Sequence, residues 1–213
     1  MTHASRTVTT PPVTVRARVR ITLERTGGQG AELLTFTGLP DPGEHVAVVL
    51  AETSPGIPLV RVHSECLTGD VFGSARCDCG PQLDESLQLL ATEGGILLYL
   101  RQEGRGIGLY NKMDTYLLQD HGKDTFEANR LIGRGADERE YAVAAAMLHA
   151  LDVPRIRLLT NNPEKVRQLR DHGVDVVSVI ATTVHVTDEN ARYLEAKARL
   201  AGHTLALGER ETV

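Results

Sequence analysis

Hydrophobic and polar residues alternate along residues 13–24, and this pattern predicts a strand. Polar or charged side chains fill the even positions. The odd positions hold Val13, Val15, Ala17, Val19, Ile21 and Leu23. Successive side chains of a strand point to opposite faces, so we expect these six residues to share one half-buried face. Residues 31–38 and 45–52 predict two more strands, and a Pro/Gly turn at 40–43 separates them. Together the three segments predict an antiparallel β unit.

From residue 57 onward, short apolar runs alternate with segments of helical periodicity. The apolar runs predict strands at 57–63, 96–100, 155–160 and 174–180. The periodic segments predict helices at 81–93, 106–120, 138–151, 163–172 and 188–201. The buried face of the second helix is expected to hold Leu109, Met113, Tyr116 and Leu117. The predicted fold class is therefore α/β (α+β): a mixed sheet with flanking helices, preceded by an antiparallel N-terminal β unit.

The same pattern predicts one domain over residues 13–203. The β unit takes up 13–55, and the α/β part takes up 56–203. A chain of 213 residues suits a single domain. Residues 1–12 are rich in Thr and end in two prolines, so we expect a disordered leader, and we expect 204–213 to form a flexible tail.

Composition narrows the classes of function. A net charge of −5 argues against a general nucleic-acid binder, which needs a basic surface. With 3 Phe, 5 Tyr and no Trp, the chain also has few aromatic side chains on which the bases of a single-stranded nucleic acid could stack. No apolar run approaches the roughly 20 residues of a membrane span, and the first 20 residues lack the apolar core of a secretory signal. We therefore expect a cytoplasmic protein with no membrane or nucleic-acid partner.

The three cysteines form a cluster in the sequence. Cys66, Cys77 and Cys79 are all the cysteines of the chain, in the run HSECLTGDVFGSARCDCG. Thiolates are soft ligands that suit Zn²⁺, and three of them leave the fourth tetrahedral position open for water. The spacing therefore predicts a catalytic zinc site, with His63 as a reserve ligand if the chain bends after the strand at 57–63. The alternative is a set of buried or redox-active thiols.

Two basic segments predict anion binding. RQEGRGIG at 101–108 lies between a strand and a helix, where glycines let backbone amides approach an anion and Arg101 and Arg105 can pair with phosphate. TNNPEK begins a helix after another strand, with Asn162 as N-cap. Lys165 lies in its first turn, where a cation opposes the helix dipole unless an anion binds there. Each segment has an ordinary alternative: a solvated turn for the first, and a capped helix with a surface lysine for the second.

Other polar residues have structural interpretations when local sequence alone is considered. Asp137 is expected to cap a helix and Arg139 to be a surface charge, in the segment GADEREY. Tyr116 lies on an apolar helix face and predicts a core residue. Asp124 and Glu127 fit ordinary acids at a helix start.

Five segments occur in this order along the chain: RVHSECLTGD, RCDCGPQL, RQEGRGIGL, ADERE and LLTNNPEK. Together they resemble the GTP cyclohydrolase II family, hydrolases of cyclic amidine C–N bonds that begin riboflavin biosynthesis. The resemblance runs from about residue 57 to residue 203 and is specific, because several motifs are long. It implies a homodimer with GTP as its substrate.

The resemblance also implies a reaction and a set of site residues. In this family, zinc-dependent hydrolysis opens the imidazole ring of GTP at C8 and releases formate and pyrophosphate, which leaves 2,5-diamino-6-(5-phosphoribosylamino)pyrimidin-4(3H)-one. Cys66, Cys77 and Cys79 would hold one Zn²⁺, and Mg²⁺ would accompany the triphosphate. The implied GTP contacts are Arg61, Val62, His63, Ser64, Glu65, Gln82, Glu103, Gly104, Arg105, Thr125, Thr160 and Lys165.

Three residues match catalytic positions of the family. Tyr116 would assist the chemistry at C8, Asp137 would be a general base, and Arg139 would be a nucleophile at the α-phosphate. Because a guanidinium is protonated at any working pH, we prefer electrostatic clamping of the α-phosphate for Arg139. A carboxylate such as Glu103 or Glu127 could accept hydrogen bonds from guanine.

The segment IATTVHVTDENARYL departs from the family pattern. It carries Thr182 and Thr183 in the region of a usual Pro-Leu pair, and Thr187 where an asparagine is expected. Two alternatives therefore stay open: a paralogue of secondary metabolism that stops at a formylated product, and a non-catalytic GTP- or zinc-sensing module. The retained Tyr116 favours the full reaction. For a dimer, an exposed edge of the N-terminal β unit is a plausible interface.

Overall fold

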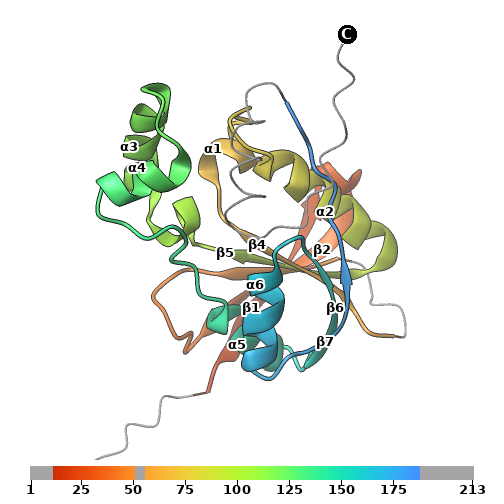
Figure 1. The fold of residues 1–213 in the computed structure, drawn as a ribbon. Helices are drawn as coiled ribbons and strands as arrows, with labels where there is room; N and C mark the ends of the chain where they lie inside the picture. Colours follow the sequence, from red (N-terminus) through yellow and green to blue (C-terminus); the bar gives the residue numbers. More distant parts are fainter. Residues whose placement is uncertain (1–11, 51–55, 188–213) are drawn as a thin grey trace, which may run out of the picture.

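One mixed sheet of seven strands organises the computed structural model, which describes residues 12–50 and 56–187 (Figure 1). The strands are β1 (Thr14–Leu23), β2 (Gln29–Thr37), β3 (Val46–Leu50), β4 (Leu59–Ser64), β5 (Gly95–Leu100), β6 (Arg155–Leu159) and β7 (Asp175–Ile180). The helices are α1 (Leu67–Asp70), α2 (Cys79–Glu93), α3 (Leu109–Asp120), α4 (Thr125–Leu131), α5 (Ala142–Ala150) and α6 (Pro163–Asp171). Short 3₁₀ turns lie at Glu24–Thr26 and Glu103–Gly106. The predicted α/β fold class is confirmed.

The N-terminal strands belong to the same sheet as the later ones. The strand order is β1-β2-β3-β5-β4-β6-β7. The pairs β1–β2, β2–β3 and β3–β5 are antiparallel, whereas β5–β4, β4–β6 and β6–β7 are parallel. The predicted antiparallel unit therefore extends a parallel α/β sheet through the pair β3–β5.

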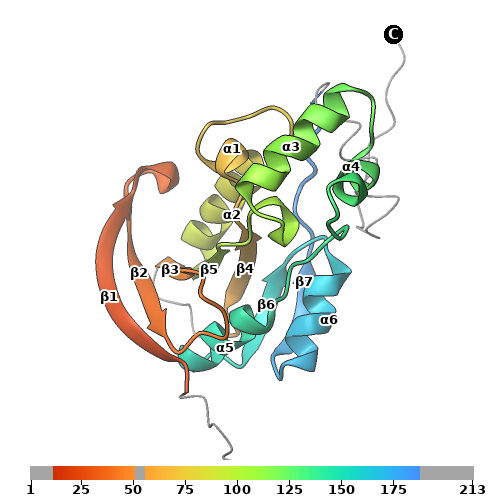
Figure 2. The same cartoon turned by 90° about the vertical axis from the view of Figure 1, so that its left-hand side faces the viewer.

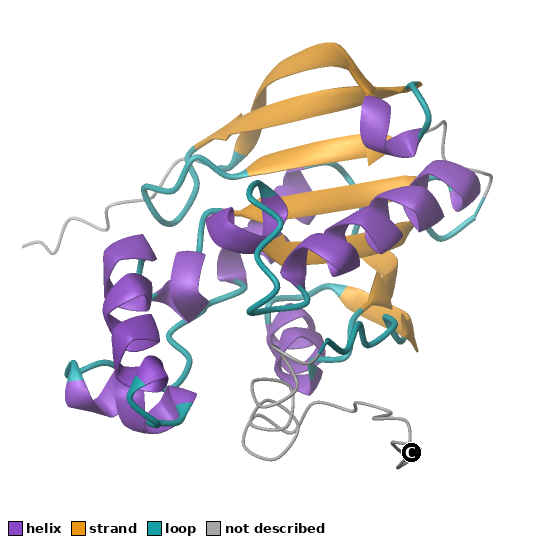
Figure 3. Cartoon of the chain, turned by 90° about the horizontal axis from the view of Figure 1, so that it is seen from above, coloured by secondary structure: helices purple, strands orange, loops and turns teal. Residues whose placement is uncertain are grey.

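Helices cover the two faces of the sheet and form two hydrophobic clusters. Helix α2 lies on one face, with Leu83, Leu87 and Leu90 packed against strand residues such as Leu59 (Figures 1 and 3). Helices α5 and α6 lie on the other face. Their cluster includes the fully buried Met147 and Leu169. Helices α3 and α4 pack on each other at one end of the sheet, away from β1 and β2 (Figure 2).

Strand β1 does not keep all six of its odd-numbered residues on one face. A bulge lies between Val15 and Ala17, because Val15 pairs with Phe36 and Ala17 pairs with Thr35. One extra residue in a strand reverses which face the later side chains occupy. As a result, Val13 and Val15 pack on the α5 cluster, while Ile21 and Leu23 pack on the α2 cluster. The expectation of a single apolar face was wrong for this reason.

Two helices begin three or four residues later than predicted. The predicted helix at 138–151 begins at Ala142, because Glu138 N–H donates to Arg105 O and Tyr141 N–H donates to Gln168 Oε1. These bonds hold residues 138–141 against neighbouring segments. Helix α3 begins at Leu109 and buries Lys112 and Thr115, whereas Leu117 is 63% exposed. The predicted apolar face of α3 was therefore wrong at Leu117.

Some predicted features lie outside the described residues. These are the leader and the tail, apart from residue 12, and the helix at 188–201. Among the described residues, every helix is too short or too polar to cross a membrane.

Candidate metal centre and active site

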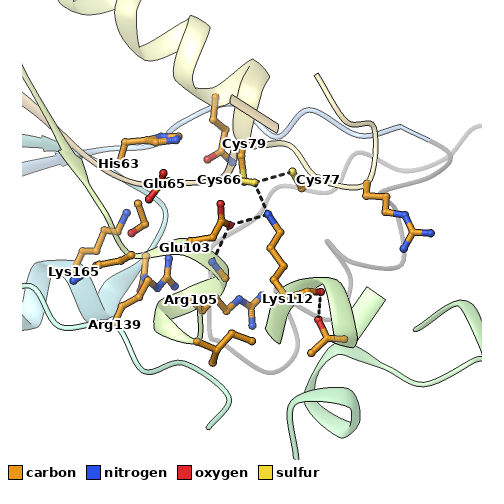
Figure 4. Close-up of a pocket in the computed structure, with 18 of the residues that line it drawn as sticks. His63, Glu65, Cys66, Cys77, Cys79, Glu103, Arg105, Lys112, Arg139 and Lys165 are labelled. Carbon is orange, nitrogen blue, oxygen red and sulfur yellow. Dashed lines mark hydrogen bonds and ion pairs between the residues drawn. The ribbon is translucent and has the colours of Figure 1, made fainter. Parts of the chain in front are cut away.

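A cavity opens beyond the carboxyl ends of β4, β5 and β6 (Figure 4). These strands are parallel, so their ends meet at one edge of the sheet, which is where open α/β sheets bind ligands. The predicted residues that line the cavity are Arg61, His63, Ser64, Glu65, Cys66, Cys77, Cys79, Gln82, Glu103, Gly104, Arg105, Tyr116, Arg139, Thr160 and Lys165. Segments far apart in sequence thus meet at one place.

Two predicted site residues, Val62 and Asp137, do not line the cavity. Val62 is fully buried in the core, and only its carbonyl faces the site, where it accepts a hydrogen bond from Lys165 Nζ at 2.7 Å. Asp137 contacts Arg139, which does line the cavity. Thr125 is the first residue of helix α4.

The cysteines come together at the junction of α1 and α2. Cys66 precedes α1, and Cys79 is the first residue of α2. Two glycines allow this close approach: a Cβ on Gly69 would lie 2.9 Å from Cys77 Sγ, and one on Gly80 would lie 2.5 Å from Gly69 O. All three sulfurs lie within 4.8 Å of one another, and all three cysteines are free.

This cluster fits a divalent metal ion. The Sγ atoms of Cys66 and Cys77 are 3.6 Å apart, far longer than the roughly 2 Å of a disulfide. A hydrogen bond from Cys77 lowers the pKa of the Cys66 thiol, and the same contact raises the pKa of Cys77 to about 11. Three soft donors that are not bonded to one another match the ligand preference of Zn²⁺. Among the described residues, these three form the group of His, Cys, Asp and Glu side chains able to hold an ion.

His63 does not join this group. It is buried, and its Nε2 lies 3.1 Å from both carboxylate oxygens of Asp70. Burial lowers the pKa of His63, so the ring is neutral at pH 7. The same Asp70 carboxylate accepts hydrogen bonds from Cys66 N–H at 2.9 Å and from the Tyr99 hydroxyl at 2.8 Å. Asp70 therefore fixes the backbone that carries Cys66.

Lys112 is a site residue that the sequence interpretation missed. Its Nζ lies 3.1 Å from Cys66 Sγ and 2.9 Å from Glu103 Oε1 (Figure 4). Thr68 Oγ1 is also 2.9 Å from Nζ. Burial by itself lowers the pKa of Lys112, but Cys66 and Glu103 outweigh this effect and raise it above its usual value. Lys112 is therefore an ammonium ion. Its spacing of four residues from Tyr116 was the available signal, since helix residues at i and i+4 share a face.

The other missed lining residues are mostly polar. They are Arg76, Gln102, Ile107, Thr115, Gln119, Asn129, Asn161, Asn162 and Thr182. Arg76 lies over the ring of Tyr116, with its guanidinium carbon 4.8 Å from the ring centroid, and pairs with Asp120 at 2.5 Å. Burial raises the pKa of Tyr116, so its phenol keeps its proton.

Cations gather on the side of the cavity away from the thiols. Lys165 and Arg139 lie across the cavity from Cys77, and Arg105 lies between (Figure 4). Arg105 adopts a left-handed backbone conformation with φ of 61° in the Glu103–Gly106 turn. Arg101, which the sequence placed with the phosphate-binding arginines, instead donates from Nε to Glu65 Oε2 at 2.9 Å. This cationic end suits a polyanion.

Arg139 and Asp137 form a two-point ion pair. Arg139 Nε donates to Asp137 Oδ1 at 2.8 Å, and Arg139 Nη2 donates to Oδ2. Burial raises the pKa of Asp137, but the hydrogen bond and the charge of Arg139 outweigh it, so the pKa is lowered. Asp137 is therefore ionised, and it orients the guanidinium.

Several buried polar atoms beside the cavity have no hydrogen-bond partner within the described residues. They include Arg61 Nε, His63 Nδ1 and Gln102 Oε1. Because His63 Nε2 faces a carboxylate, its proton sits there, and Nδ1 is an acceptor. Buried polar groups are normally paired, so these atoms indicate that a polar ligand completes the site.

The segment that departs from the family pattern borders the same cavity. Asn161 and Thr182 exchange two backbone–side-chain hydrogen bonds, and Thr182 lines the cavity. Thr183 N–H donates to Glu85 at 3.0 Å. A proline at either threonine position would lack this N–H donor, so the two threonines anchor the segment by bonds that proline cannot form.

Comparisons with known proteins agree on one family. The model of the family GTP cyclohydrolase II matches residues 16–181. GTP cyclohydrolase-2 of Vibrio cholerae serotype O1 is 53% identical over 195 residues, which cover 91% of this chain and 98% of that protein. GTP cyclohydrolase-2 of Vibrio parahaemolyticus is 51% identical over 193 residues, covering 90% and 98%. The riboflavin biosynthesis protein RibBA of Bacillus cereus is 47% identical over 195 residues, which cover 91% of this chain and 49% of that protein.

Proposed function

The chain belongs to the GTP cyclohydrolase II family, a family of hydrolases in riboflavin biosynthesis, and from this premise we propose the complete reaction for it. GTP is hydrolysed at C8 with release of formate and pyrophosphate, and the diaminopyrimidine ribosyl phosphate is the product. The observation that carries the proposal is a cavity with a three-thiol cluster at one end and Arg105, Arg139 and Lys165 at the other.

The thiol end fits the chemistry at the base. A Zn²⁺ ion held by Cys66, Cys77 and Cys79 would supply a Lewis acid and a bound water of lowered pKa. Tyr116 lines this part of the cavity and keeps its proton, so its phenol can donate a hydrogen bond to a purine nitrogen as the ring opens.

Acceptors for the guanine edge come from neutral side chains. Glu127 pairs with Lys123 at 2.8 Å and does not line the cavity. Glu103 already accepts from Leu67 N–H, Gly104 N–H and Lys112. Neither carboxylate is supported as the group that reads guanine. The free acceptors His63 Nδ1 and Gln102 Oε1 can instead accept from the N–H groups of guanine.

The cationic end fits the triphosphate. Arg139 is held by Asp137 through two hydrogen bonds, a geometry that keeps the guanidinium protonated and oriented. This arrangement supports Arg139 as an electrostatic clamp on the α-phosphate and Asp137 as the residue that positions it. Lys165 and Arg105 add positive charge at the same end, and Mg²⁺ would offset the rest of the triphosphate charge.

The proposal is tested by supplying the protein with GTP, Mg²⁺ and Zn²⁺ while the ultraviolet spectrum and formate are followed. We expect formate and a diaminopyrimidine in equal amounts. Removing the metal with a chelator should abolish formate release, and Zn²⁺ should restore it, since the chain's own groups lack a Lewis acid. A control at the same chelator concentration with Zn²⁺ in excess excludes damage by the chelator.

Other outcomes would support the alternatives. Ring opening without formate would identify a paralogue that yields the formylated product. An unchanged purine spectrum with tight GTP binding would identify a sensing module. The retained Tyr116, Arg139 and thiol cluster favour the full reaction over both.

A homodimer in the cytoplasm is proposed as the working state of the enzyme. The edge strand β1 supports the dimer, because Val19 is 52% exposed there and no strand among the described residues pairs with its outer side.

A further inference from the structure

We propose that Lys112 is a positioning residue of the metal centre: its ammonium group holds the Cys66 thiolate against Glu103 and draws electron density from that one sulfur. The inference rests on the proposed function, because it takes the three thiols as metal ligands. It assigns a role to the residue that the predicted apolar face of α3 left out.

Each of the three N–H donors of Lys112 has an acceptor nearby. Its residue is only 8% exposed, although α3 lies at the end of the sheet. Nζ has three N–H groups, and three acceptors lie within reach: Cys66 Sγ at 3.1 Å, Thr68 Oγ1 at 2.9 Å and Glu103 Oε1 at 2.9 Å. A buried ammonium is unfavourable unless it is paired in this way.

The charges explain why a cation belongs there. Three thiolates and one divalent ion sum to a charge of −1, and Glu103 adds another −1 within hydrogen-bond distance of Lys112. An N⁺–H donor forms a strong, charge-assisted bond to an anionic acceptor. Such a bond lowers the electron donation of the sulfur, and outer groups of this kind orient the ligands of a metal and tune its properties.

Lys112 also links the thiol cluster to the turn at Glu103–Gly106. Glu103 Oε2 accepts from Leu67 N–H at 2.6 Å, immediately after Cys66, and Oε1 accepts from Gly104 N–H at 2.9 Å. The pair Lys112–Glu103 therefore joins the Cys66 segment to the turn that carries Arg105. We infer that both ends of the substrate site depend on this buried ion pair.

The experiment uses Co²⁺ as the metal in the wild-type protein and in Lys112→Met, whose unbranched side chain is one atom shorter and lacks the charge and the donors. We expect the thiolate-to-cobalt charge-transfer bands to move to longer wavelength in the variant, because the sulfur electrons are then held less tightly. Competition with a chelator should show metal affinity lowered by about tenfold or more, the range found for outer-shell partners of metal ligands.

Lys123→Met is the matched control. Lys123 is 42% exposed, and its partner Glu127 lies outside the cavity, so neither the bands nor the affinity should change. If Lys112→Met does not fold, Lys112→Gln gives the same test with a neutral donor, and its band shift should be in the same direction and smaller.

Two results would overturn the proposal, and they are distinguishable. Unchanged bands and affinity in a folded Lys112 variant would show that the side chain only fills space, and they would leave the proposed function intact. Absence of thiolate-to-cobalt bands in the wild-type protein would remove the metal centre itself, and with it both this inference and the zinc chemistry.

Discussion

At the scale of single residues, the site is built on buried polar side chains whose partners come from other elements. Asp70 is 4% exposed, and its carboxylate forms hydrogen bonds with His63, Cys66 and Tyr99. Sequence interpretation found the thiols and the basic motifs because their spacing is local. It did not find Asp70 or Lys112, since a buried charge is recognised only by partners that the fold brings near it.

Asp70→Asn should destabilise the protein strongly. The amide cannot accept all the hydrogen bonds of the carboxylate, so we expect the free energy of unfolding to fall by about 2–4 kcal/mol. Urea denaturation measures this change. Asp84→Asn is the control, because its exposed pair with Arg25 should contribute less than about 1 kcal/mol. Equal effects of the two substitutions would contradict the role given to Asp70.

Arg139→Lys should keep substantial activity if Arg139 is a clamp. A lysine retains the charge and loses the two-point geometry, so we expect kcat/KM to fall by roughly tenfold, and Arg139→Met to cost about 10²-fold or more. Steady-state formate release measures both. Near-total loss in Arg139→Lys with unchanged GTP affinity would argue instead for covalent participation of Arg139.

At the scale of elements, helix α6 shows how a local motif sets a functional position. Asn162 Oδ1 accepts from Glu164 N–H at 2.9 Å and caps the helix, as the sequence predicted. Lys165 then lies in the first turn, buried, with its ammonium bonded to Val62 O. The cap at Asn162 therefore fixes the start of the helix, and this start places Lys165 at the cavity.

Asn162 substitutions separate the cap from the charge. Asn162→Ala should lower the free energy of unfolding by about 1 kcal/mol through loss of the cap. Asn162→Asp keeps the acceptor and should keep the stability, but its negative charge beside the cavity should weaken GTP binding. Thermal unfolding and equilibrium titration with GTP measure the two effects. Unaltered GTP affinity in Asn162→Asp would place the phosphates away from this helix.

At the scale of the whole molecule, the continuous sheet leaves β1 as one outer strand and β7 as the other. An outer strand offers unpaired backbone groups to a second copy of the chain. The bulge after Val15 puts Val19 and Ile21 on the opposite face from Val15, and Val19 is 52% exposed in the single chain. A substitution at Val19 therefore tests the proposed dimer interface directly.

Val19→Lys should convert the proposed dimer into a folded monomer. A charge at an exposed strand position should change the intrinsic fold little, within about 0.5 kcal/mol, while it opposes burial between two copies. Sedimentation velocity measures the assembly. Val177→Lys is the matched control, since Val177 is exposed on β7 at the other edge of the sheet. A Val19→Lys protein that remains dimeric would locate the interface elsewhere.

The order and type of most elements, the thiol cluster and the family could all be predicted from the amino-acid sequence. These depend on periodicity and short-range spacing: alternation in β1, leucines along α2, the cap of α6, and three cysteines between positions 66 and 79. Which face each side chain takes depends on three-dimensional packing. Because of the bulge in β1, the apolar residues after Val15 lie on the other face of the sheet. The hydrogen bond from Glu138 N–H to Arg105 O keeps residue 138 out of helix α5. Burial of Lys112 likewise follows from Cys66 and Glu103, which lie 46 and 9 residues away in the chain. Such long-range contacts depend on packing and have no local signature in the sequence.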